Sequence, residues 1–87
     1  MVGFGNIAKR LCHLLTGFDV TISAFDKHFD KSHAYFYNVQ EKLLEHIFVE
    51  SDVVVILLPY YSELDKFIDR RLLSLMHYSS LIIIAAR

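Results

Sequence analysis

Two glycines near the start of the chain, Gly3 and Gly5, have the type and spacing that could bind a phosphate group. With Ala8 they form the pattern Gly-x-Gly-x-x-Ala, which is typical of a tight turn between a buried strand and a helix. A glycine has no Cβ, so an anion can approach the backbone amides at the positive end of the helix dipole. The turn therefore predicts a place for the pyrophosphate of a dinucleotide.

Asp26 lies 21 positions after Gly5, directly after a strand predicted at residues 19–25. A carboxylate at this spacing can bind the hydroxyls of an adenosine ribose, and its charge would repel a ribose phosphate. The pattern therefore favours NAD over NADP, although Lys27 directly afterwards weakens that preference. The alternative is a tight turn in an α/β domain that binds nothing, with Asp26 as a solvated strand end.

Helical spacing of apolar residues predicts the helices that would present these groups. The first covers residues 6–17 and ends at Gly17, and the others cover 40–49 and 62–76. The last helix could consist of two pieces, capped by Ser62 and Asp69.

Runs of β-branched or wholly apolar residues predict strands at 19–25, 53–58 and 81–86. An aromatic run predicts a short edge strand at 35–39, after a charged connection at 26–33. This alternation favours an α/β fold with a parallel sheet and flanking helices.

Only Met1 and Val2 precede the glycine turn, although the first strand is central in a doubly wound sheet. We therefore expect a short central strand and a marginally stable chain. The run from Leu81 to Ala86 would form an apolar sheet edge through which the chain could self-associate.

Composition narrows the classes of partner. The net charge is −1, so we expect no nucleic-acid partner, and the apolar run at 53–58 is too short to span a membrane. The single cysteine, Cys12, excludes an internal disulfide and favours a cytoplasmic location. The five histidines and Cys12 lack the spacing of metal ligands, so no metal site is predicted.

The chain resembles the NAD-binding domain of the D-isomer-specific 2-hydroxyacid dehydrogenases. The resemblance rests on residues 3–8, 23–26, 51–59 and 79–87, which occur in the family's order and cover essentially the whole chain. It implies that residues 1–87 are a partial Rossmann-type domain, a doubly wound parallel sheet without a substrate domain. In the intact enzyme, a hydride would pass between NAD and a small 2-hydroxy or 2-oxo acid.

The family's site residues carry over to matching positions of this chain. The resemblance implies that the pyrophosphate is held by Gly3, Gly5, Asn6 and Ile7, and the adenosine ribose by Asp26. It also implies that Pro59 and Tyr60 border the adenosine half and that Ala85 and Ala86 lie near the nicotinamide.

Arg87 matches the family's catalytic arginine, whose planar guanidinium suits a carboxylate. The family's catalytic histidine and its acidic partner lie beyond the position of Arg87, so we expect no turnover by these 87 residues alone. The alternatives are a non-catalytic module that binds a nucleotide or another protein, and a gene relic without function.

Overall fold

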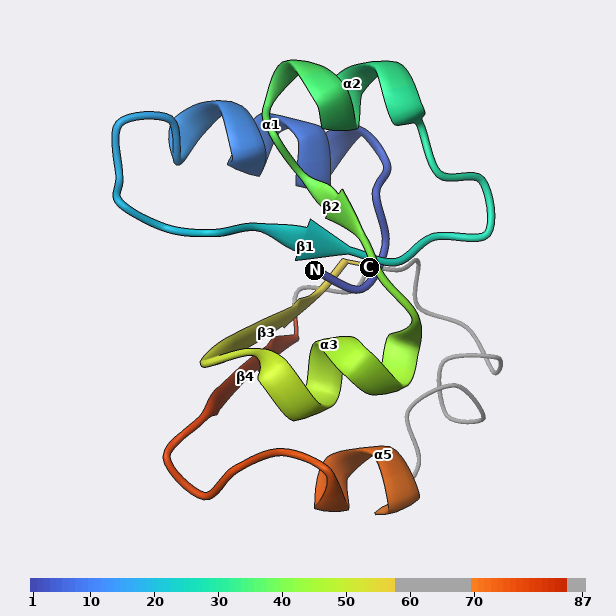
Figure 1. The fold of residues 1–87 in the computed structure, drawn as a ribbon, viewed down its shortest axis with the longest axis vertical. Coiled ribbons are helices and arrows are strands. Elements are labelled where there is room, and N and C mark those ends of the chain that lie inside the picture. The colour runs from blue at the N-terminus through green and yellow to red at the C-terminus, as the bar shows by residue number, and fades with distance from the viewer. Residues whose placement is uncertain (58–69, 85–87) are drawn as a thin grey trace.

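The computed structural model of the chain describes residues 1–57 and 70–84, in which helices alternate with parallel strands (Figure 1). In chain order the elements are α1 (Asn6–Leu14), β1 (Ser23–Ala24), α2 (Lys31–Phe36), β2 (Gln40–Glu41), α3 (Leu44–Glu50), β3 (Val53–Ile56), α5 (Arg70–Ser74) and β4 (Leu81–Ile84). The predicted α/β fold with parallel strands is confirmed.

The residues before the glycine turn join two strand pairs, β1–β2 and β3–β4, into one sheet. On one side, the Val2 N–H donates to Val55 O at 2.8 Å, and Leu57 N–H donates to Val2 O at 2.8 Å. On the other side, Gly3 N–H donates to Phe25 O at 2.7 Å. The spatial order is therefore β2, β1, residues 1–3, β3, β4, which is the order expected when the first strand is central.

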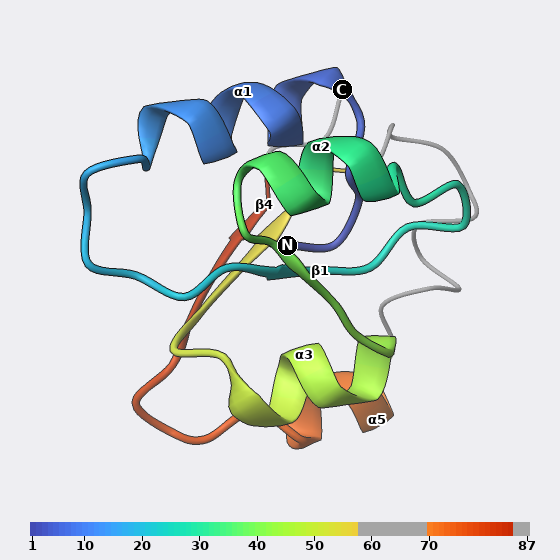
Figure 2. The ribbon, with the colours of Figure 1, turned by 45° about the horizontal axis from the view of Figure 1, so that its top comes forward.

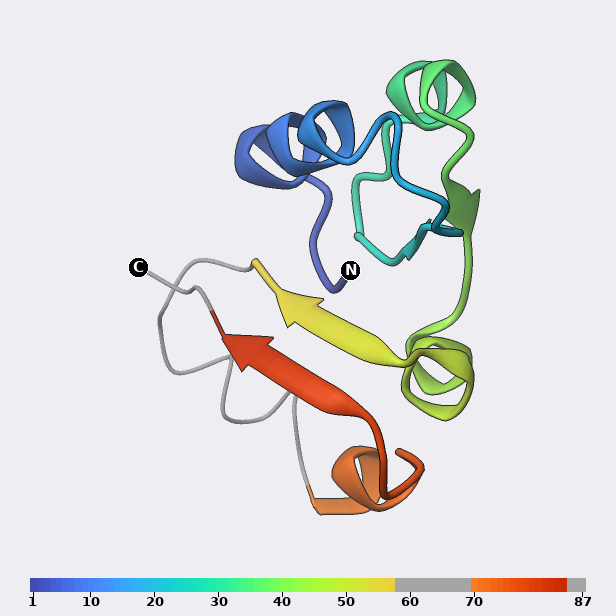
Figure 3. The same cartoon turned by 90° about the vertical axis from the view of Figure 1, so that its left-hand side faces the viewer.

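The helices cover both faces of this sheet (Figure 3). Helices α1 and α2 lie over a core cluster formed by Met1, Phe4, Ala8, Cys12, Ala24, Ala34 and Val39. Helices α3 and α5 lie over a second cluster formed by Val2, Ile47, Phe48, Val54, Ile56 and Leu72. Met1 and Val2 thus enter opposite clusters, as consecutive residues of a strand do. Both faces need apolar side chains, which explains why β3 has no polar alternation.

The predicted edge strand at 35–39 is wrong, because helix α2 occupies residues 31–36. The side chain of Asp30 caps α2 by accepting the His33 N–H, and Ala34 is its buried residue. The helix ends with Asn38 in the left-handed region, at φ 58°. There the Val39 N–H donates to Ala34 O at 2.7 Å and the Asn38 N–H donates to Tyr35 O at 3.2 Å, which is the Schellman pattern.

Several predicted boundaries also move. Helix α1 stops at Leu14, and Gly17 lies in the following turn at φ 98°. Residues 40 and 41 begin the helix predicted at 40–49 but form β2, so α3 starts only at Leu44. The strands predicted at 19–25, 53–58 and 81–86 are confirmed as β1, β3 and β4. Strands β1 and β3 are shorter than predicted, and residues 85 and 86 lie outside the described residues. Residues 62–69, with the predicted caps Ser62 and Asp69, lie outside the described residues.

Within residues 1–57 and 70–84, no helix is long and apolar enough to cross a membrane. In the same part of the chain, no group of three His, Cys, Asp or Glu side chains gathers as a metal site would require. Cys12 is a buried free thiol, and burial raises its pKa.

Candidate dinucleotide-binding site

The glycine turn connects the central strand segment to α1 at the carboxyl edge of the sheet (Figure 2). Gly3 has φ 100°, a conformation that L side chains rarely adopt, and its N–H is bonded to Phe25 O. Gly5 is the N-cap of α1, and a Cβ added there would meet no atom of residues 1–57 and 70–84 within 4 Å. Protein packing therefore does not require glycine at position 5, whereas a ligand lying over the turn would.

The first turn of α1 offers backbone donors beside this open space. The first intrahelical bond runs from Lys9 N–H to Gly5 O at 3.0 Å, so the helix leaves the amides of Asn6 and Ile7 without intrahelical acceptors. Both residues are exposed. Their amides and the helix dipole can attract an anion, and the pyrophosphate of a dinucleotide fits these donors and the open space.

Asp26 lies at the carboxyl end of β1, directly against the glycine turn. Its Oδ2 accepts the N–H of Phe4, between the two glycines, at 2.6 Å, and its Oδ1 accepts the His28 N–H at 2.8 Å. The carboxylate is half-buried. It therefore has a defined position beside the first turn of α1, and part of it remains exposed to solvent.

No motif in the sequence indicated four side chains that surround the glycine turn and Asp26, namely Phe4, Phe29, Lys9 and Asp30. The rings of Phe4 and Phe29 stack with centroids 5.1 Å apart. The Lys9 ammonium lies 2.9 Å from Oδ2 of Asp30. The Lys9 hydrogen bond and the His33 N–H hold the pKa of Asp30 well below its usual range. The only sequence signal was the charge of the 26–33 segment, which does not tell which basic residue meets which acid.

Five predicted site residues lie outside the described residues: Pro59, Tyr60, Ala85, Ala86 and Arg87. Their roles stay predictions. The structure does bring together the other predicted members, because Gly3, Gly5, Asn6 and Ile7 form one turn and Asp26 is bonded to that turn.

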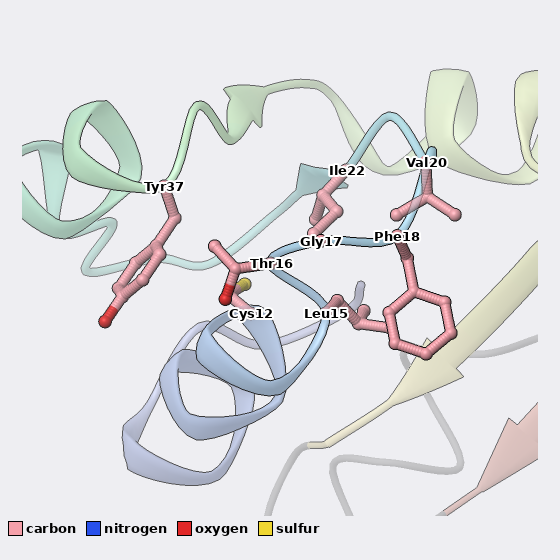
Figure 4. A pocket seen from close by; sticks show the side chains of 8 residues that line it. All are labelled: Cys12, Leu15, Thr16, Gly17, Phe18, Val20, Ile22 and Tyr37. Carbon is pink, nitrogen blue, oxygen red and sulfur yellow. The ribbon is translucent and has the colours of Figure 1, made fainter.

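A hollow of about 190 Å³ lies at the opposite end of α1 from the glycine turn (Figure 4). It is lined by Cys12, Leu15, Thr16, Gly17, Phe18, Val20, Ile22 and Tyr37. Most of these residues belong to the end of α1 and to the segment that leads into β1, at the amino edge of the sheet. Ligands of open α/β sheets bind at the carboxyl edge, so we do not assign the dinucleotide to this hollow.

Comparison with known families identifies the arrangement. Residues 1–87 match the model of the "D-isomer specific 2-hydroxyacid dehydrogenase, NAD binding domain". The chain belongs to the D-isomer specific 2-hydroxyacid dehydrogenase family. The family resemblance expected from the motifs is thereby confirmed.

Individual relatives agree with this family assignment. The chain is 32% identical over 87 residues to YoaD of Bacillus subtilis (strain 168), a candidate 2-hydroxyacid dehydrogenase, and covers 24% of that protein. It superposes on the apo structure of D-lactate dehydrogenase from Escherichia coli with a TM-score of 0.87, at 26% identity, covering 99% of this chain and 27% of that one. The chain also shares its fold with the D-isomer specific 2-hydroxyacid dehydrogenase of Lactobacillus delbrueckii ssp. bulgaricus, which was solved in its NAD-complexed form. That superposition has a TM-score of 0.85 at 20% identity and covers 99% of this chain and 25% of that one.

The share of each relative that the chain covers shows how much of a full-length relative these residues match. The chain spans about a quarter of the length of the relatives that it matches. The matched residues therefore correspond to the NAD-binding domain of the family and not to the whole length of these relatives.

Proposed function

We propose that these residues bind NAD as part of a dehydrogenase that acts on a small D-2-hydroxy acid. The pyrophosphate would lie over Gly5, on the amides of Asn6 and Ile7. The ribose hydroxyls of the adenosine would bind the carboxylate of Asp26, whose charge favours NAD over NADP.

The observation that carries this proposal is the hydrogen bond of 2.6 Å between Asp26 Oδ2 and the Phe4 N–H. Through this bond the carboxylate lies at a fixed place beside the glycine turn. The open space over Gly5 supports it as well, because a Cβ there would meet no atom of the described residues within 4 Å. A fully solvated strand end would lack the hydrogen bond to the Phe4 N–H.

The other residue roles extend the site toward the substrate. Bound NAD would supply a hydride acceptor at its nicotinamide ring. Ala85 and Ala86 would lie beside that ring, and Pro59 and Tyr60 would border the adenosine. Arg87 would hold the carboxylate of the 2-hydroxy acid with two parallel hydrogen bonds. A histidine outside these residues would move the proton, so we expect no turnover by the 87 residues alone.

Titration of the 87-residue chain with NADH, followed by nucleotide fluorescence, tests the proposal. We expect saturable binding that is tighter for NADH than for NADPH and is lost in Asp26→Ala. The matched control is Asp52→Ala, because the Asp52 side chain is 95% exposed and precedes β3 at the amino edge of the sheet. Equal NADH affinity in Asp26→Ala and the unaltered chain would contradict the proposal. Oxidation of NADH with glyoxylate, pyruvate or hydroxypyruvate that Arg87→Ala abolishes would contradict only the expectation that the 87 residues alone do not turn over substrate.

We also propose self-association through β4. Its side chains Leu81, Ile83 and Ile84 are 56%, 44% and 62% exposed, and within the described residues it pairs only with β3. An apolar edge of this kind is a template for pairing with a second copy. Sedimentation velocity should show concentration-dependent association of the 87-residue chain that Ile83→Lys reduces. A monomer at all concentrations would refute the second proposal and leave the first intact.

A further inference from the structure

We propose that Lys9 and Phe29 are positioning residues, which hold the segment from Asp26 to Asp30 against the glycine turn and so fix the carboxylate of Asp26 for the ribose. The inference rests on the proposed binding of NAD. It concerns contacts between this segment and the turn and first helix, which no sequence motif indicated.

The segment is attached to the residues of the turn and of α1 at three points. At its start, Asp26 accepts the Phe4 N–H at 2.6 Å. Near its end, the Phe29 ring stacks on the Phe4 ring with an interplanar angle of 21°. At its end, Asp30 accepts a hydrogen bond of 2.9 Å from the Lys9 ammonium. Three attachments leave the segment little freedom to carry Asp26 away from the turn.

These contacts are less exposed to solvent than an ordinary surface ion pair. The side chains of Lys9 and Asp30 are only 22% and 33% exposed, and Phe4 is 2% exposed. The Lys9 ammonium also lies 6.0 Å from the centroid of the Phe4 ring, so one cation contacts both the acid and the aromatic stack. A partly buried pair is screened less by salt than an exposed one.

Asp30 also connects this attachment to the following helix. Its Oδ1 accepts the His33 N–H at 3.1 Å as the N-cap of α2, while its Oδ2 faces both Lys9 and the His33 ring at 3.0 Å. Lys9 is therefore the cleaner position to perturb, because its removal leaves the cap of α2 in place.

The decisive measurement is the ratio of the Kd for 2′-deoxy-ADP to the Kd for ADP, obtained by competition against NADH. A carboxylate that accepts a hydrogen bond from the 2′-hydroxyl should make this ratio about tenfold in the unaltered chain. Lys9→Met keeps the aliphatic stem but removes the ammonium, so we expect its ratio to fall below about threefold. Lys9→Arg can still donate to Asp30 and should restore the ratio.

If Lys9 had only a structural role, its removal would weaken the binding of ADP and of 2′-deoxy-ADP equally, and the ratio of their Kd values would stay unchanged. Circular dichroism at low temperature should establish that each variant is folded, and Phe29→Leu gives a second perturbation should Lys9→Met fail to fold. Asp52→Asn removes an acidic charge at the opposite sheet edge and should keep the tenfold ratio.

The outcomes separate this inference from the proposed function. A tenfold ratio that persists in the folded variants at positions 9 and 29 would overturn the positioning role alone. A ratio near one in the unaltered chain would overturn ribose binding by Asp26, and the positioning role with it.

Discussion

The substitution Asp26→Ala tests how strongly the glycine turn depends on one carboxylate. It removes the acceptor of the Phe4 N–H at 2.6 Å and of the His28 N–H at 2.8 Å. Phe4 is 2% exposed, so its amide cannot readily regain a water partner, whereas His28 is exposed and its amide can. An unsatisfied buried donor costs about 1–3 kcal/mol, so we expect the free energy of unfolding to fall by about 2 kcal/mol. Total stability of a domain is about 5–15 kcal/mol, so this loss is readily measured.

Urea unfolding followed by circular dichroism gives the free energies of unfolding. Asp26→Asn retains one carbonyl oxygen for the Phe4 N–H and should lose about 1 kcal/mol, roughly half as much as alanine. Asp52→Ala, at a side chain that is 95% exposed, should change the stability by less than about 0.5 kcal/mol. The reasoning is refuted should Asp26→Ala destabilise the chain no more than Asp52→Ala.

Three further predictions concern stability. Ile47→Ala should lower the free energy of unfolding by about 2–5 kcal/mol because Ile47 is 0% exposed, whereas Leu43→Ala at 60% exposure should lose far less in the same urea assay. Asn38→Gly should raise the melting temperature, with a gain of up to about 1 kcal/mol because φ is 58°, and Asn38→Ala should lower it. Burial lowers the pKa of the Met1 ammonium from 8.0 to about 6. Between these pH values the unfolded chain therefore binds more protons than the folded chain, and the free energy of unfolding should rise from pH 6 to pH 8 by about 2–3 kcal/mol. Urea titrations of chain whose mass shows that Met1 is retained should show this rise, and Nα-acetylation should remove it. A rise with pH that persists after acetylation would contradict its assignment to the Met1 ammonium.

Local sequence was sufficient for the glycine turn and for Asp26. The turn depends on residues that are adjacent in the chain, and the distance from Gly5 to Asp26 is set by one helix and one strand. Wholly apolar runs likewise identified β3 and β4, because a strand covered on both faces has no polar alternation.

The error at 35–39 shows where local preference is overridden. The aromatic run favours a strand, but the cap at Asp30 and the left-handed turn at Asn38 together stabilise a helix. The helix places Ala34 in the core cluster, and Val39 follows it into the same cluster. Residues 40 and 41 are the start of the helix predicted at 40–49. The pairing of Gln40 with Ser23 places them in β2 instead.

The sequence by itself determined the family, the α/β alternation and the residues that form the glycine turn. These follow from backbone requirements and apolar patterns that act within a few residues. Only the tertiary structure decided that Asp26 bonds to Phe4 and that Lys9 meets Asp30. Contacts between residues more than 20 positions apart depend on how the intervening segment packs, and the spacing of residue types carries no record of that path.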